Sequence, residues 1–350
     1  MLGFLFGWNF WLLLKIPLYL LLFIIVYFWY RFGYKISKQR ARLASQNLPI
    51  VKLAGMNPVK DMEELLQKHG DTLYPIREAV KKYPDAKGFV LEFGSLLCIN
   101  LVDPNYIKEF NNKIIHDFER FSAMKTIDYI AKNGIPGLME DDWKLHRKIL
   151  SDSFRFDLFE KNISANQEAT IEYFQSLSEK EMQEWRPKEQ LRRAFSAILG
   201  QNFFGENIDK RTVQGKSALK YIYEVFDDIN AINMSLLVGI LGPGIVKYCL
   251  LPSHRRYLAK AKIYRDFLIS IIQEKREALE NSKSKELKNI IEGMLEAQKQ
   301  FPDKAAILDD ESIAGEFVTL FVAGTDTTST LLSVTTYLLT LYPDLVKDLR

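Results

Sequence analysis

Cysteine and histidine are scarce in this sequence, and their scarcity excludes several kinds of protein. The 350 residues include only two cysteines, Cys98 and Cys249. Two cysteines so far apart provide neither a disulfide framework nor a metal-binding spacing, so a reducing compartment is the simpler assumption. The histidines are scattered and lack the close pairing of a zinc site. They are His69, His116, His146 and His254.

An excess of charge of one sign is also missing. The 47 Lys and Arg residues nearly balance 44 Asp and Glu, which leaves a net charge of +3. No dense basic tract is interleaved with aromatic residues, so nucleic acid is not an expected partner. The sequence has no Gly-rich phosphate-binding loop ending in Lys-Ser/Thr and no nucleophile elbow. With 47% hydrophobic residues, it can form one large domain or two smaller ones.

A long apolar segment opens the chain. Residues Trp8 to Tyr30 are apolar and aromatic, interrupted by Lys15 and Pro17. About 20 apolar residues span a bilayer, so residues 1–32 are predicted to form a membrane anchor. Five basic residues follow at once, which predicts that the rest of the chain faces the cytosol: Arg31, Lys35, Lys38, Arg40 and Arg42. The alternative, a cleaved signal peptide, lacks a basic start and a small-residue cleavage site.

The region after the anchor reads as a linker followed by a small sheet. Residues 33–58 are basic and punctuated by Pro49 and Pro58, which predicts a linker. A short helix is expected at 61–69, and two strands at 88–93 and 96–102 suggest a hairpin. Asp103-Pro104 begins a helix through Phe110, and Cys98 is expected to be a small buried side chain on its strand.

The following two thirds of the chain are predicted to be mostly helical. Between Leu236 and Pro252 lies an apolar loop, which is either a membrane contact and substrate-access lid or plain core packing. The expected helices cover 141–154, 167–181, 189–204, 213–230, 254–280, 285–300 and 310–341, and a last one begins at Pro343.

The helix at 141–154 carries a pair of side chains that can bind a carboxylate. Trp143 and Arg147 stand one turn apart on the same face. An indole N–H and a guanidinium are both donors, which suits a carboxylate held from two sides. A surface arginine stacked on a tryptophan has the same spacing, so both interpretations stay open on spacing alone. His146 is expected to be an exposed helical residue.

The helix at 310–341 contains a stretch that violates local propensity. Gly324 costs about 1 kcal/mol in mid-helix relative to alanine, and the threonines around it are poor helix formers. Such violations are expected at functional or strained sites. Thr327 lies four residues after Ala323 on the same side, where its hydroxyl can bond a ligand or its own preceding turn. The alternative is a small-residue packing seam with Asp326 turned to solvent.

The letters Ala-Gly-Thr-Asp-Thr-Thr-Ser, from Ala323 to Ser329, resemble the oxygen-activating helix of the haem-thiolate monooxygenases, the cytochrome P450 family. The Trp143-x-x-x-Arg147 pair resembles the family's pair that holds a haem propionate. This resemblance implies a fold that is mainly α, a P450-like helical domain with a small N-terminal β-sheet, plus one N-terminal transmembrane helix. Residues 59–350 would then be a partial catalytic domain.

The resemblance also implies roles for individual residues. Thr327 would be the hydroxyl that delivers protons to bound oxygen, and Asp326 the relay acid that supplies them. Trp143 and Arg147 would hold a propionate. The residues that line the haem would be Ala323, Gly324 and Thr328.

The cofactor and partners follow from the same resemblance. It implies haem b, electrons from NADPH through a membrane-bound cytochrome reductase, a lipophilic small-molecule substrate, and a single-pass location in the bilayer of the endoplasmic reticulum with the catalytic domain in the cytosol. The family's Glu-x-x-Arg helix and iron-ligating cysteine loop would lie beyond Arg350, so we expect a piece of a longer protein, with no iron ligand in this chain and no activity of these 350 residues alone. The alternative is a non-catalytic, membrane-anchored helical protein of P450 descent that binds lipid or a partner.

Overall fold

The structure is a computed structural model that divides into two compact units, Met1–Phe118 and Glu119–Arg350. The described residues are 3–46, 48–54, 58–93, 96–114, 122–138, 140–153, 160, 163–233, 235, 237–238, 242–282, 289–300 and 308–348.

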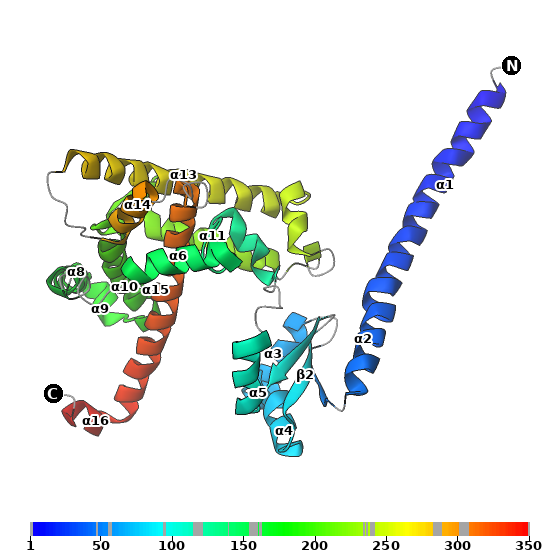
Figure 1. Cartoon of the computed structure of the whole chain (residues 1–350), viewed down its shortest axis with the longest axis horizontal. Helices are drawn as coiled ribbons and strands as arrows, with labels where there is room; N and C mark the ends of the chain where they lie inside the picture. The colour runs from blue at the N-terminus through cyan, green and yellow to red at the C-terminus, as the bar shows by residue number, and fades with distance from the viewer. Residues whose placement is uncertain are drawn as a thin grey trace. The chain divides into compact units, whose positions relative to one another are not determined.

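The first unit begins with one uninterrupted helical rod (Figure 1). It consists of α1 (Gly3–Phe28), the π-helical segment η1 (Trp29–Tyr34) and α2 (Lys35–Ala44). Pro17 lies inside α1 without ending it. The part from Lys15 to Ala44 is long enough to cross a bilayer; its most apolar 18-residue window has a mean hydropathy of 1.7 and is not buried at all. This N-terminal apolar helix is consistent with membrane anchoring.

A three-stranded sheet follows, with β2 (Gly88–Phe93) in the centre. It pairs in parallel with β1 (Ile50–Ala54) and antiparallel with β3 (Leu96–Leu101), which confirms the predicted hairpin. The segment expected as a linker therefore holds both α2 and the unexpected strand β1. Val51, Ala79 and Phe89 form a small core here.

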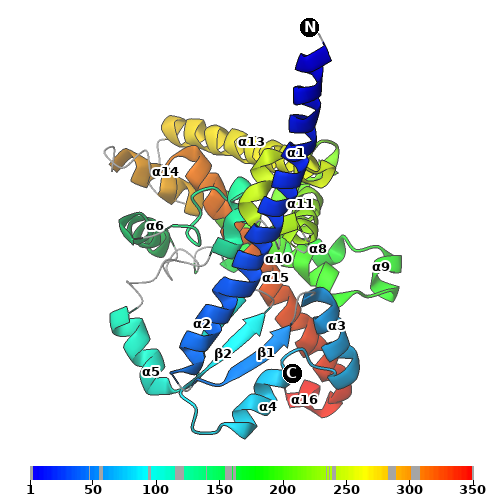
Figure 2. The same ribbon diagram turned by 90° about the vertical axis from the view of Figure 1, so that its right-hand side faces the viewer.

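Short helices complete the first unit. The predicted helix at 61–69 is present as α3 (Pro58–His69), which contacts β1 together with α4 (Tyr74–Lys82), as Figure 2 shows. The helix α5 (Pro104–Glu109) continues as the π-helical η2 (Phe110–Ile114). Cys98 is exposed on β3, so the expectation that it is buried was wrong; β3 is an outer strand of this sheet.

The second unit is almost entirely helical, as expected. Its helices are α6 (Glu140–Ser153), α8 (Ile163–Gln175), α9 (Glu179–Gln183), α10 (Pro187–Phe204), α11 (Ala218–Asn233), α13 (Pro252–Asn281), α14 (Ile290–Gln300), α15 (Asp310–Leu341) and α16 (Pro343–Asp348). Short 3₁₀ segments are η4 (Ser122–Tyr129), η5 (Ile208–Lys210) and η6 (Pro243–Tyr248). In the apolar stretch that contains η6, Val246 is buried and Tyr248 is exposed.

Two predicted helices differ from the structure. The one expected at 167–181 ends at Gln175, because Ser178 and Glu181 form a capping box that starts α9. The one expected from 213 begins at Ala218, because β4 (Thr212–Val213) and β5 (Lys216–Ser217) form a small hairpin first. Gln214 and Gly215 occupy its turn with positive φ values of 50° and 76°, which two-residue hairpin turns require.

The helix α15 runs through the core of the second unit, within the bounds predicted for it. Asp309 caps it by accepting a hydrogen bond from the Ser312 N–H. Its first half is buried, with Phe317 packed on Phe203 and Phe204 of α10. It packs most extensively against α10 and also contacts α13. It too is long and apolar enough to cross a bilayer, but its burial identifies it as the core helix of this unit.

Candidate active site

The second half of α15 carries an exposed face that begins at Ala323 and Thr327. Both side chains are exposed, and the Thr327 hydroxyl donates to the Ala323 carbonyl at 2.6 Å. Apolar side chains at helical spacing extend this face and are also exposed: Leu331, Val334, Leu338 and Leu341. The hydroxyl thus stands at one end of an open apolar surface, bonded only to its own preceding turn among the described residues.

Asp326 belongs to a different set of contacts. Its carboxylate accepts a hydrogen bond from Arg192 of α10 at 2.8 Å, and Lys188 Nζ lies 4.0 Å away. Asp326 is 46% exposed in this ion pair, so it is reachable by water. The two catalytic candidates adjoin in sequence but hold different partners: Thr327 bonds its own helix, and Asp326 bonds α10.

The Arg192 guanidinium continues this network into the core. It lies 4.3 Å from the centre of the Tyr223 ring, and Tyr223 Oη is 2.8 Å from Thr325 Oγ1. Because Thr325 Oγ1 donates to the Phe321 carbonyl, the Tyr223 hydroxyl is the donor in their contact. Burial raises the pKa of Tyr223, partly offset by its hydrogen bond with Thr325 and the nearby Arg192. Tyr223 therefore stays protonated at neutral pH.

Sequence reasoning overlooked Arg192, Tyr223 and Thr325. Thr325 is wholly buried, although it stands inside the motif that drew attention to this helix. Thr325 and Asp326 both find hydrogen-bond partners on other helices. The run of polar residues inside an apolar helix was the sequence feature that could have indicated such partners. Which helix supplies the partner depends on packing across more than one hundred residues.

Gly324 and Thr328 face the protein and not the open surface. A Cβ atom at Gly324 would stand 2.8 Å from Cδ1 of Leu199 on α10. Thr328 is half-buried. Gly324 is thus a point of close helix–helix approach.

The two residues of the pair on α6, Trp143 and Arg147, differ in solvent exposure. Trp143 is half-buried and Arg147 is exposed. Within the described part of the chain, no hydrogen bond or ion pair occupies the Arg147 guanidinium. An exposed cation beside an indole is therefore ready for an external anion.

His146 was expected to be exposed, and that expectation was wrong. Its ring is wholly buried, with Nδ1 2.7 Å from Oε1 of Glu316, which is also wholly buried. The buried carboxyl group of α15 requires a hydrogen-bonding partner, and α6 supplies it. This contact fixes α6 on α15.

The contact also relates the two motifs in space. Glu316 and Ala323 are seven residues apart on α15, which places them on nearly the same face, about 10.5 Å apart along the axis. The helix that carries Trp143 and Arg147 is thus bound to α15 two turns before Ala323 and Thr327. One motif's helix therefore contacts the other motif's helix through His146 and Glu316.

The family model described as Cytochrome P450 matches residues 57–350. The chain belongs to the cytochrome P450 family. Its fold is the mainly helical P450-like fold with small β-sheets.

Several P450 relatives show the extent of the similarity. Cytochrome P450 2J5 of Mus musculus is 26% identical over 280 residues, which cover 79% of this chain and 54% of that protein. A 7-deoxyloganic acid hydroxylase of Catharanthus roseus is 24% identical, covering 72% of this chain and 48% of that protein. The crystal structure of the cytochrome P450DA heme domain superimposes with a TM-score of 0.58 at 17% identity, covering 86% of this chain and 62% of that one. This chain thus spans about half the length of its curated relatives.

The residues present fit the haem that P450 proteins normally bind. Arg147 offers an exposed cation for a propionate, and Ala323 starts an apolar surface with a small side chain. Among the described residues, no three His, Cys, Asp or Glu side chains are grouped to hold a metal ion.

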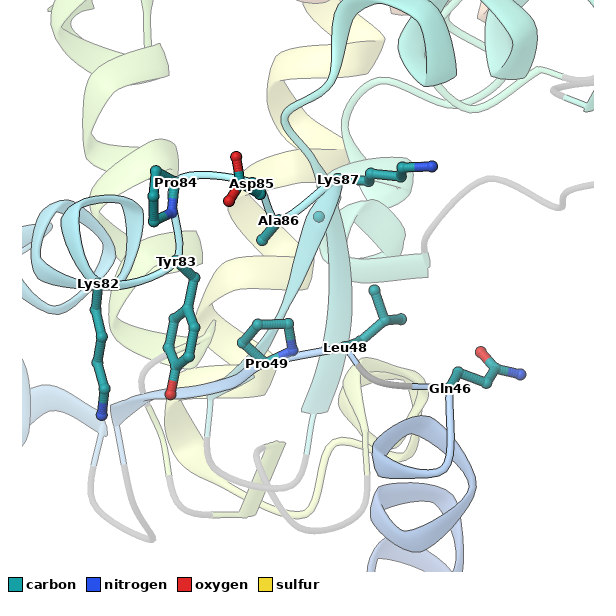
Figure 3. A pocket seen from close by; sticks show the side chains of 10 residues that line it. Gln46, Leu48, Pro49, Lys82, Tyr83, Pro84, Asp85, Ala86 and Lys87 are labelled. Carbon is teal, nitrogen blue, oxygen red and sulfur yellow. The ribbon is translucent and has the colours of Figure 1, made fainter.

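A pocket lies in the first unit, and its lining residues are none of the candidate site residues (Figure 3). It has a volume of about 480 Å³ and lies between the end of α2 and the connection from α4 to β2. Lys82, Lys87 and Asp85 contribute its charges, beside Pro49 and Tyr83. Lys87 is engaged by the Tyr106 hydroxyl at 3.1 Å, and the hydrogen bond raises the Lys87 pKa.

Proposed function

We propose that this chain carries the oxygen-activating part of a haem-dependent monooxygenase. The reaction would insert one atom of O₂ into a lipophilic substrate, with electrons from an NADPH-dependent cytochrome reductase. The site would be held at the endoplasmic reticulum membrane, in the cytosol, by the N-terminal helix. The observation that carries the proposal is the His146–Glu316 contact, because it ties α6, which bears Trp143 and Arg147, to the helix that bears Ala323 and Thr327.

Haem b, when bound, supplies the iron at which oxygen is activated. Arg147 and Trp143 would bind a propionate from α6, where a guanidinium contributes a charge-assisted hydrogen bond. Ala323 would leave room beside the ring, with Gly324 and Thr328 flanking it on the helix. The exposed apolar face of α15 would exclude water on that side.

Proton delivery would fall to Thr327 and Asp326. The Thr327 hydroxyl can release the Ala323 carbonyl and turn its oxygen to a ligand, since this contact is its own helix's and not a tertiary one. Asp326 is half-exposed and can exchange protons with water. Arg192 keeps the carboxylate near one end of α10, so a proton would pass from solvent to Asp326 and then towards Thr327.

Haem uptake by the purified chain tests the proposal without requiring turnover. We expect titration with haem, followed at the Soret band, to saturate at one haem per chain. Arg147→Ala should weaken binding by about tenfold or more, since a hydrogen bond to a charged group contributes about 1.5–3 kcal/mol. Lys148→Ala removes the neighbouring exposed cation of α6 and is the matched control.

Two results would contradict the proposal. A folded chain that takes up no haem would favour the non-catalytic reading, a membrane-anchored helical protein that binds lipid or a partner. Equal losses for Arg147→Ala and Lys148→Ala would show that general charge, and not a propionate contact, governs the binding.

A further inference from the structure

The helix α2 has two unlike faces, and only one of them meets the first unit's sheet. Ile36, Arg40 and Leu43 follow one another at spacings of four and three residues, on one face. Ile36 is buried, and Arg40 Nη2 lies 2.5 Å from Oε1 of Glu92 on β2. This face is pinned to the sheet, which fixes how α2 is rotated about its axis.

The other face carries three basic residues, Lys35, Lys38 and Arg42, here named the basic stripe. Their spacing of three and four residues puts them on one side of α2. All three are exposed, and within the described residues none of them makes an ion pair. Arg40, by contrast, pairs with Glu92 on the other face.

Aromatic residues mark where the membrane surface meets this helix. Trp29 and Tyr30 each stack on Tyr34, with ring centres 5.8 and 6.0 Å apart. All three rings are largely exposed. Tryptophan and tyrosine gather at the headgroup level of membranes, and the apolar run ends here. The bilayer interface therefore falls at η1, directly before the stripe.

The distances along the helix place the stripe against the lipid headgroups. With a rise of about 1.5 Å per residue, Lys35, Lys38 and Arg42 lie about 1.5, 6 and 12 Å beyond Tyr34. The surface potential of an anionic leaflet decays over a Debye length of about 8 Å at physiological salt. Lys35 and Lys38 fall within this layer, and the long side chain of Arg42 reaches back to its edge.

We propose that the basic stripe binds the headgroups of anionic phospholipids, so that the anchor selects its lipid neighbours as well as crossing the bilayer. The proposal rests on the membrane anchoring of the proposed function and goes beyond it. An acidic protein could also meet a basic surface, but Lys35 and Lys38 lie within about 6 Å of the headgroup level whenever the anchor is inserted. Position therefore favours the lipid.

Lipid selectivity in reconstituted vesicles tests the proposal. The full chain is inserted into phosphatidylcholine vesicles, and its association with spin-labelled phosphatidylserine is compared with that of spin-labelled phosphatidylcholine. We expect phosphatidylserine to be preferred by at least about threefold, since each basic residue near the surface adds to the electrostatic attraction for anionic lipid. The preference should weaken as salt is raised. The K35Q/K38Q/R42Q variant should bring the ratio to about one, and K35E/K38E/R42E should invert it.

Two control variants separate the stripe from charge in general. Arg40→Gln removes a basic residue of the same helix that faces Glu92, and we expect it to leave the ratio unchanged. K68Q/K82Q/K108Q removes three exposed charges from α3, α4 and α5, and should also leave it unchanged.

Each remaining outcome rejects either the membrane anchor or the binding of lipid by the basic stripe. A wild-type chain that washes off vesicles at high pH lacks the anchor, and the proposed membrane location fails with it. A chain that stays inserted but shows no preference, or a preference that the stripe variants leave intact, overturns only the stripe proposal. If those variants lose binding to an acidic protein while their lipid preference is unchanged, the stripe is a protein-docking surface.

Discussion

Nδ1 of His146 lies 2.7 Å from Oε1 of Glu316, and both side chains are wholly buried. The two residues are 170 positions apart in sequence and join α6 to α15. Glu316 Oε2 has no hydrogen-bond partner among the described residues, so the imidazole is the main support of this carboxyl group. Anything that loosens the contact frees the helix that carries Trp143 and Arg147.

Truncation of Glu316 should therefore destabilise the second unit. Glu316→Ala leaves a buried imidazole nitrogen without its partner, which costs about 1–3 kcal/mol. For a unit of this size we expect the thermal midpoint to fall by roughly 3–10 °C. Glu316→Gln keeps a hydrogen-bonding oxygen and should recover most of the loss. Glu172, whose partner Lys210 is at the surface, provides the control, since Glu172→Ala should change the midpoint little.

The two glycines of α15 should respond differently to alanine. A Cβ at Gly315 would overlap the backbone carbonyl of Lys132, whereas at Gly324 it would meet the end of the Leu199 side chain. Backbone cannot yield, so we expect Gly315→Ala to destabilise by about 1–3 kcal/mol. At Gly324 the side chain can shift, and the gain in helix propensity of about 1 kcal/mol offsets the strain. Urea unfolding of both variants measures the difference; equal losses would contradict it.

Gly315 and Gly324 illustrate which features of the fold could be predicted from the sequence and which could not. The bounds of α15 and the β2–β3 hairpin were predictable, because periodicity and turn residues are local. Gly324 was singled out for its unusual neighbours, but Gly315, in an ordinary helical context, makes the closer approach. The partners of His146 and Asp326 stand 170 and 134 residues away. A contact between distant helices leaves no local pattern, so neither partner could be predicted.

Acid should weaken the second unit through Glu206. Burial alone would raise the pKa of this carboxyl group, but hydrogen bonds from Arg211 and Lys275 outweigh it, so the pKa is lowered. A lowered pKa in the folded state stabilises the fold above the unfolded value of about 4.3 and loses that effect as pH falls through the folded value. We expect the unfolding free energies of wild type and Glu206→Gln to converge between about pH 5 and 3. For the exposed Glu172–Lys210 pair, Glu172→Gln should show little difference at any pH.

Loss of the Asp326 carboxylate should affect proton delivery more than stability. Asp326→Asn removes a half-exposed ion pair with Arg192, worth about 0–1 kcal/mol. In a haem-loaded enzyme that includes the iron-ligating loop and is supplied by its reductase, we expect slower turnover and a larger rate difference between H₂O and D₂O. Arg193 pairs with Glu181 instead, so Arg193→Ala serves as the control. An unchanged solvent isotope effect in Asp326→Asn would remove Asp326 from the relay.

The Thr327 hydroxyl should determine how tightly NADPH consumption is coupled to product formation. Its side chain is exposed at the start of the open face of α15, and its hydroxyl bonds only the Ala323 carbonyl among the described residues. We expect Thr327→Ala to keep consuming NADPH while the fraction converted to product falls by at least about tenfold, since a positioned proton donor typically contributes about 10²–10⁴-fold to its step. Thr327→Ser retains the hydroxyl and should restore most of the coupling. Thr335 lies two turns on, is exposed and bonds the Leu331 carbonyl in the same way, so Thr335→Ala controls for loss of a helical threonine. If Thr327→Ala and Thr335→Ala convert the same fraction of consumed NADPH into product, the hydroxyl of Thr327 has a structural role only.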